Sequence, residues 1–98
     1  MSRRTAIADA LQRLAPGIPP HECMAVVDHA LDSAGLRTAA PETAAWLSLV
    51  AYARHVFTDY DELLHQGYDI QSARFFVTEA INDVLEGWGV RRRVSHEE

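Results

Sequence analysis

The sequence predicts an all-α fold, and three observations support this prediction. Apolar residues recur at spacings of three and four along most of the chain, which is the period of amphipathic helices. Glycine and proline interrupt the chain at intervals that suit helix lengths. No segment shows the strict alternation of a half-buried strand. We therefore expect a small orthogonal or bundle-like helical domain of four helices plus one short helix, with residues 1–98 forming a single unit.

The first two helices are expected from about Arg3 to Leu14 and from Pro19-Pro20 to about residue 34. Ser2 can cap the first helix and Pro16 stops it, whereas proline is tolerated in the first turn of the second. Gly35 is expected to end the second helix in the left-handed conformation. The residues expected to face inward on the second helix are Met24, Val27, Ala30, Leu31 and Ala34.

A third helix is expected to begin at Pro41, and it is apolar on nearly every side from Trp46 to Phe57. Such a helix needs neighbours all around it, so we expect it at the centre of the fold. Thr58 then lies at the N-cap of a short helix, and Asp61 follows at the spacing of a capping box. Gly67 is expected to end that short helix in the left-handed conformation.

The last helix is expected to start at its cap, Asp69, and to end at Gly89. Its expected inward-facing residues are Ile70, Ala73, Val77, Ala80, Ile81, Val84, Leu85 and Trp88. Its expected outward-facing residues are Gln71, Arg74, Thr78, Asn82, Asp83 and Glu86. Bulky core residues expected from the other segments and from this helix also include Leu47, Val50, Phe57, Leu63, Leu64 and Phe76. From about residue 90 to residue 98 the chain is polar, and we expect a flexible C-terminal tail.

Composition narrows the function classes. The formal net charge is −5 and every basic residue is an arginine, which disfavours a fold that binds polyanions over its whole surface. Cys23 is the single cysteine and cannot form an internal disulfide, so we expect a cytoplasmic protein. The N-terminal segment lacks the apolar core of a signal peptide, and no apolar stretch is long enough to span a membrane.

The second half of the chain contains a pattern that extends across two expected helix boundaries. Its positions are Arg54, His55, Thr58, Tyr60, Asp61, Leu63, Leu64, Gly67, Ala73, Arg74 and Trp88. This pattern resembles that of the bacterial domain of unknown function family 2293, small helical proteins with an RHxxTxYDxLL signature. The resemblance implies a small helical fold and conveys no activity. The chain departs from the family between residues 33 and 42, where SAGLRTAAPE replaces an expected glycine- and arginine-rich segment.

A polar cluster lies where the third helix meets the short helix. Its members are Arg54, His55, Thr58, Tyr60 and Asp61, together with Arg74 from the last helix. We interpret the cluster as structural, because a junction between helices must satisfy its free backbone groups by caps and ion pairs. A general-base role for a histidine beside a carboxylate is the functional alternative, but no activated nucleophile accompanies it. We therefore expect a protein that is not an enzyme, has no cofactor and has no catalytic residues.

Three further hypotheses remain open. A metal site would use His55, Asp59, Asp61 and His65, with His29 or His21 from the second helix, and is the least favoured. A nucleic-acid contact would use Arg3, Arg4, Arg91, Arg92 and Arg93, provided that the two chain ends meet. The favoured hypothesis is a protein-interaction or scaffolding module, in which a partner protein or a second copy covers surplus apolar residues. Those residues are Tyr52, Phe75, Phe76, Trp88 and Val90.

Overall fold

The computed structural model describes residues 1–96. They form α1 (Arg3–Leu14), α2 (Pro20–Asp32), the 3-10 turn η1 (Ala34–Leu36), α3 (Pro41–Phe57), α4 (Tyr60–His65) and α5 (Ile70–Gly87). No strand occurs within these residues, so the predicted all-α fold of four helices and a short one is confirmed. None of the described helices is long and apolar enough to cross a membrane.

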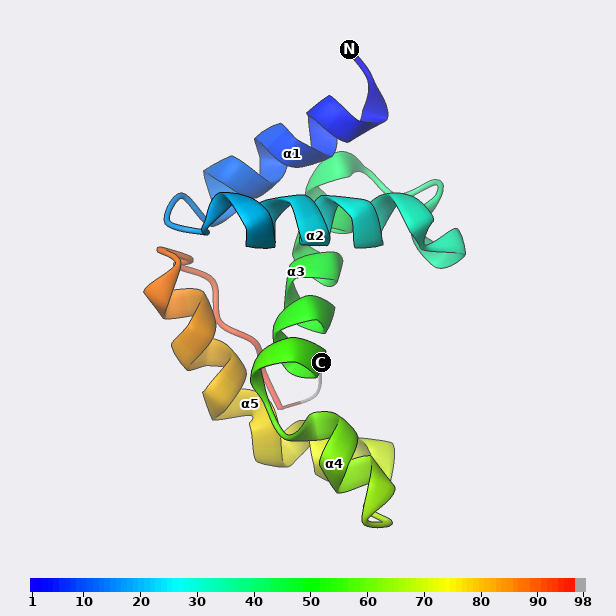
Figure 1. The fold of residues 1–98 in the computed structure, drawn as a ribbon, viewed down its shortest axis with the longest axis vertical. Helices are drawn as coiled ribbons and strands as arrows, with labels where there is room; N and C mark the ends of the chain where they lie inside the picture. Colours follow the sequence, from blue (N-terminus) through cyan, green and yellow to red (C-terminus); the bar gives the residue numbers. More distant parts are fainter. Residues whose placement is uncertain (97–98) are drawn as a thin grey trace.

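Helix α3 runs through the middle of the molecule and connects two layers (Figure 1). At its N-terminal end it packs against α1 and α2, which also pack against each other, and its other half packs against α5. The short α4 packs on α5. Fully buried alanines on α3, among them Ala44, Ala45 and Ala53, let the neighbouring helices approach closely. The prediction that this helix is central is confirmed.

Most helix ends follow the sequence signals. Ser2 accepts a hydrogen bond from the Thr5 N–H at 3.1 Å, and Asp69 accepts one from the Ser72 N–H at 2.7 Å, so both predicted caps are present. The hydrogen bond from Ser72 lowers the pKa of the Asp69 carboxyl. Helix α5 ends at Gly87, two residues before Gly89, the glycine predicted to terminate it. The Val90 N–H donates to the Leu85 carbonyl at 3.0 Å and closes this helix end.

Two predicted glycine ends are confirmed and one is wrong. Gly67 and Gly89 adopt positive φ angles of 102° and 81° after α4 and α5. Gly35 has no positive φ, because α2 ends earlier, at Asp32, and the chain tightens into η1. That turn directs the partly buried Leu36 back onto the core, and the Arg3 guanidinium donates to the Leu36 carbonyl at 2.7 Å.

Several residues expected inside are exposed. Met24 on α2 is 63% exposed, because α2 turns a narrow face of Cys23, Val26, Val27 and Ala30 towards the core. The other large apolar residues whose predicted burial is wrong are Leu47, Phe57, Ile70 and Phe76. Ala34 and Ala80 are exposed as well. The core of this small domain is narrower than the apolar stripes, so part of each stripe remains at the surface.

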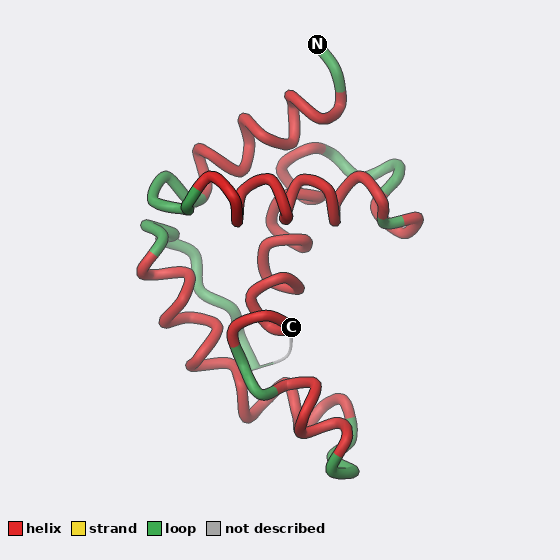
Figure 2. The backbone as a smooth tube through the Cα atoms, viewed as in Figure 1, coloured by secondary structure: helices red, strands yellow, loops and turns green. Residues whose placement is uncertain are grey.

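The segment after α5 packs back onto the fold. It returns along α5 towards the middle of the molecule (Figure 2), and Val90 and Val94 are 7% and 5% exposed. The Asn82 side chain donates to the Val94 carbonyl at 3.1 Å and accepts from the Val94 N–H at 2.7 Å. Thr78 and Asn82, expected on the outer face of the helix, are therefore buried. The flexibility expected for residues 90–98 stays a prediction; the structure shows that Val90 and Val94 pack against the fold, and residues 97 and 98 lie outside the described part.

Candidate functional site

The polar cluster is built around the break between α3 and α4. Thr58 ends α3, and its hydroxyl donates to the Arg54 carbonyl and accepts a hydrogen bond from the Tyr60 N–H at 3.2 Å. The N-cap residue of α4 is Asp59 and not Thr58 as predicted from the sequence, and the Asp59 side chain makes no capping hydrogen bond. The predicted capping box is wrong, because the Asp61 carboxylate pairs with His55 at 2.7 Å.

The cluster divides into an outward pair and an inward pair. His55 and Asp61 form an ion pair with side chains 50% and 64% exposed, so this contact is solvated and contributes about 0–1 kcal/mol to stability. Arg54 is only 7% exposed, and its guanidinium lies 5.5 Å from the centre of the buried Tyr60 ring. Arg74, from α5, faces the same cavity as Arg54. The six residues therefore do not share one cleft.

The metal hypothesis finds no ligand set in the described residues. Among residues 1–96, no group of three or more histidine, cysteine, aspartate or glutamate side chains is arranged to hold a metal ion. Within the proposed set, the structure brings together only His55 and Asp61. His21 pairs instead with Glu22 at 2.9 Å.

The two chain ends do not combine their arginines. Arg4 pairs with Asp28 at 2.7 Å near the start of α1, whereas Arg91 and Arg92 lie beside Arg13 near its end. Arg4 and Arg13 are nine residues apart on α1, so the helix separates these groups by about 14 Å along its axis. Arg93 pairs with Glu79 at 3.4 Å. A single patch of all five terminal arginines is therefore not formed, and contact with nucleic acid stays an untested prediction.

One cavity of about 430 Å³ is lined by arginines from both sets considered in the sequence analysis, the polar cluster and the terminal arginines. We call it the arginine pocket, and it is defined by Arg54, Arg74, Arg92, Trp46, Leu47 and Val50. Arg92 reaches it from the C-terminal segment and lies 4.0 Å from the centre of the Trp46 ring. Sequence reasoning could not place Arg92 there, because helical periodicity carries no information about the path of a non-helical segment.

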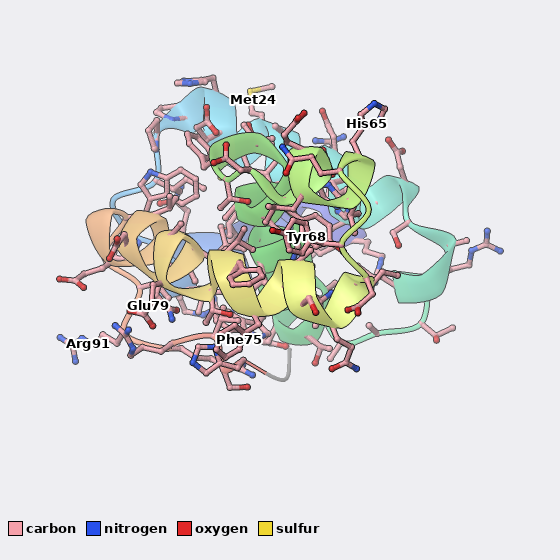
Figure 3. All side chains as sticks on the ribbon, turned by 90° about the horizontal axis from the view of Figure 1, so that it is seen from below. Met24, His65, Tyr68, Phe75, Glu79 and Arg91 are labelled. Carbon is pink, nitrogen blue, oxygen red and sulfur yellow. The ribbon has the colours of Figure 1, made fainter. Side chains whose placement is uncertain are left out.

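A second cavity of about 430 Å³ lies between the α3–α4 junction and α5. We call it the aromatic groove, and its main lining residues are Phe57, Asp59, Leu63, Tyr68, Phe76 and Ala80. Tyr68 and Phe76 meet edge to face at 5.5 Å. Figure 3 shows Tyr68 between α4 and α5, with Phe75 on the opposite side of α5, where its ring lies 4.6 Å from that of His96.

The surplus apolar residues of the sequence analysis separate into two groups. Phe75 and Phe76 are 54% and 59% exposed. Trp88 and Val90 are buried, and Trp88 packs edge to face on Phe57 at 5.4 Å. Tyr52 is partly buried, so among these five residues the adjacent phenylalanines, on two different faces of α5, are the ones left for a partner to cover.

The fold and these two cavities define a small all-helical domain with an arginine-lined pocket and a separate aromatic groove at the α3–α4 junction. The chain belongs to the family described as "Uncharacterized conserved protein (DUF2293)", whose model matches residues 10–89, so the resemblance noted from the sequence is confirmed. The match includes Trp46, Arg54 and Arg74 and ends before Arg92. No curated protein and no solved structure matches the chain.

Proposed function

We propose that this protein is a non-catalytic binding module whose aromatic groove takes an amphipathic helical segment of a partner protein. The observation behind the proposal is the exposure of aromatic side chains around a concave surface. Phe57, Tyr68 and Phe76 are 42%, 43% and 59% exposed, and all three line the groove. Apolar anchors entering a hydrophobic groove are the usual mode by which an amphipathic helix is recognised.

The exposed area is large enough to matter. A large aromatic side chain has roughly 150–250 Å² of surface, so three that are about half exposed present on the order of 300 Å². Patches of this size on a monomer are often functional. Leu63 and Ala80 extend the apolar lining between them.

Charge favours a basic partner over a second copy. Asp59 lines the groove, and the exposed Asp83 follows Ala80 by three residues on α5, which places it on the same face of that helix. No arginine is among the described residues that line the groove. A second copy of a chain with formal charge −5 would bring more acidic groups to this surface, whereas a helix with lysine or arginine flanks would complement it.

The polar groups near the groove support binding without chemistry. The Thr58 hydroxyl lines the groove but is already bonded to the Arg54 carbonyl and the Tyr60 N–H. The His55–Asp61 pair, the obvious acid–base candidate, is not part of the lining. A general base must lie within hydrogen-bond reach of its substrate, so this arrangement favours a partner surface over an active site.

The adjacent phenylalanines provide a matched test. A photo-crosslinking amino acid is placed at position 76 or, as the control, at position 75, and the chain is irradiated in its native cells. We expect position 76 to capture a segment of another protein with apolar residues at helical spacing and basic flanks, and position 75 not to capture it. The captured segment, made as a peptide, should bind the wild-type protein and lose affinity for Phe76→Ser but not for Phe75→Ser.

Two outcomes would contradict this proposal. Capture of the same proteins from both positions would mean that exposure, not the groove, determines the contact. Capture of this chain alone, with a dimer mass in analytical ultracentrifugation, would show that a second copy occupies the groove.

A further inference from the structure

We infer that the arginine pocket binds a small organic phosphate, namely a phosphate monoester with a compact apolar body. This site lies apart from the aromatic groove, and the inference does not depend on the proposed function. Three segments distant in sequence meet there: α3 supplies Arg54, α5 supplies Arg74 and the C-terminal segment supplies Arg92.

Two arginines of the pocket, Arg74 and Arg92, have no ion-pair partner among the described residues. None of the described lining residues is acidic. Elsewhere on the surface Arg4, Arg13 and Arg93 each pair with a carboxylate, but no ion pair within residues 1–96 involves Arg74 or Arg92. In a chain with 14 acidic and 9 basic residues, two guanidinium groups facing a cavity whose described lining holds no carboxylate indicate a site for an external anion.

Arg74 provides a second and independent indication. Its Nε is buried and has no hydrogen-bond partner among the described residues. A buried donor without a partner costs free energy, and an acceptor oxygen of a ligand in the pocket would recover that cost. Guanidinium groups present planar arrays of N–H donors that match the oxygens of a phosphate.

The other two arginines are held in place by aromatic rings. Arg92 stacks on Trp46 at 4.0 Å, and Trp46 is itself only 4% exposed. Arg54 lies over the Tyr60 ring. For Arg92, stacking covers the face of the guanidinium and leaves its N–H edges available to an acceptor in the plane. Little side-chain freedom is then lost when a ligand binds.

The apolar floor and the volume indicate the kind of molecule. Trp46 and Val50 form a buried floor, and Leu47 is 46% exposed beside them. A cavity of about 430 Å³ is in the range for small ligands. A phosphate monoester has a charge of roughly −1.5 to −2 at neutral pH and three acceptor oxygens, which suits several guanidinium groups better than a single carboxylate.

The test uses phenyl phosphate as the probe, followed by calorimetry and by two-dimensional ¹H–¹⁵N NMR of the full chain. The chain has two tryptophans, so the indole N–H signal of Trp46 reports on the pocket while that of Trp88 is an internal control. We expect saturable binding that shifts the Trp46 signal and leaves the Trp88 signal in place. Inorganic phosphate and benzoate should bind more weakly than phenyl phosphate, and phenol should not bind.

Matched variants assign the site. Arg74→Gln and Arg92→Gln are expected to weaken phenyl phosphate binding by about tenfold or more. Arg91→Gln removes the same charge from the neighbouring residue, which does not line the pocket, and should change affinity less than about twofold. The double variant Glu97→Gln/Glu98→Gln should bind at least as tightly as the wild type, because it removes only negative charge.

Three results would overturn the inference. The first is equal loss of binding in Arg91→Gln and Arg92→Gln, which would indicate a diffuse charge effect. The second is loss of binding in the glutamine double variant. The third is equally tight binding of an oligonucleotide without terminal phosphates, which would indicate a surface for nucleic-acid backbone.

Discussion

The most direct test of the fold concerns Asn82, whose side chain bonds both backbone groups of Val94. We predict that Asn82→Ala lowers the free energy of unfolding by about 2–6 kcal/mol. Each of the two buried hydrogen bonds leaves an unsatisfied backbone group when its partner is removed, at about 1–3 kcal/mol per group. The loss cannot exceed the free energy that docks the segment, since a detached segment regains its hydrogen bonds from water. Burial of Val90 and Val94 sets that limit at roughly 3–6 kcal/mol.

Two variants separate the hydrogen bonds from packing and from charge. Val94→Ala keeps both backbone bonds and removes two methyl groups, so it should cost about 1.6 kcal/mol. Asp83→Ala changes an exposed neighbour and should stay within about 0.5 kcal/mol of the wild type. Urea unfolding followed by circular dichroism gives all three values.

Amide exchange provides the refuting result. In the wild type the Val94 amide should exchange slowly because Asn82 accepts its hydrogen at 2.7 Å. If that amide exchanges as fast as a free peptide, and Asn82→Ala unfolds at the same urea concentration as Asp83→Ala, the segment is not docked. The positioning of Arg92 would then lose its basis as well, since that residue precedes Val94 by two.

Three further predictions test separate parts of the structure. Thr58→Ala should lower the free energy of unfolding by about 0.5–2 kcal/mol, because both hydrogen bonds of its hydroxyl close the α3–α4 break. In the same denaturation assay Asp61→Ala should lower it by under about 1 kcal/mol, because its pair with His55 is exposed. Equal losses would contradict the structural role given to Thr58. Gly67→Ala should lower the unfolding free energy by about 1–2 kcal/mol because φ is 102°, while Gly35→Ala should leave it unchanged or raise it by about 0.4–1 kcal/mol. Burial, helped by the Glu22 carboxylate, raises the pKa of Tyr52 from 10.0 to about 12. The folded state therefore keeps this proton to a higher pH than the unfolded state, so the free energy of unfolding should fall as the pH rises from about 10 to about 12. Over the same range the free energy of unfolding of Tyr52→Phe should fall less. Identical pH profiles for the two proteins would refute the pKa shift.

Signals that act within one helix were predictable from the sequence. Ser2 and Asp69 cap their helices because a short polar side chain can reach the free N–H groups of the next turn. Gly67 ends α4 because the left-handed conformation is available to it without strain. The central place of α3 followed from the apolar residues on nearly all of its sides.

The errors arose where two local signals competed. Thr58 and Asp61 have the spacing of a capping box, but the Asp61 carboxylate pairs with the His55 ring at 2.7 Å, and the Thr58 hydroxyl is shared by both helices, since it donates to the Arg54 carbonyl and accepts from the Tyr60 N–H. Gly35 follows a helical pattern, yet the helix stops before it because Leu36 reaches the core through a tighter turn. Spacing alone contains no information about which of two partners lies closer in the fold.

The arginine pocket shows a different limit of sequence reasoning. Thr78 and Asn82 lie on the polar stripe of α5, and periodicity assigns such a stripe to water. The C-terminal segment covers that stripe instead, and the amide of Asn82 satisfies the backbone of an irregular chain that would otherwise be buried without partners. That docking is what brings Arg92 over Trp46 and next to the cavity of Arg54 and Arg74. The proposed anion site therefore depends on the buried side-chain amide of Asn82, a residue that helical periodicity assigns to the solvent-exposed face. An asparagine on the polar face of a helix near a chain end can equally well hold the backbone of the terminal segment.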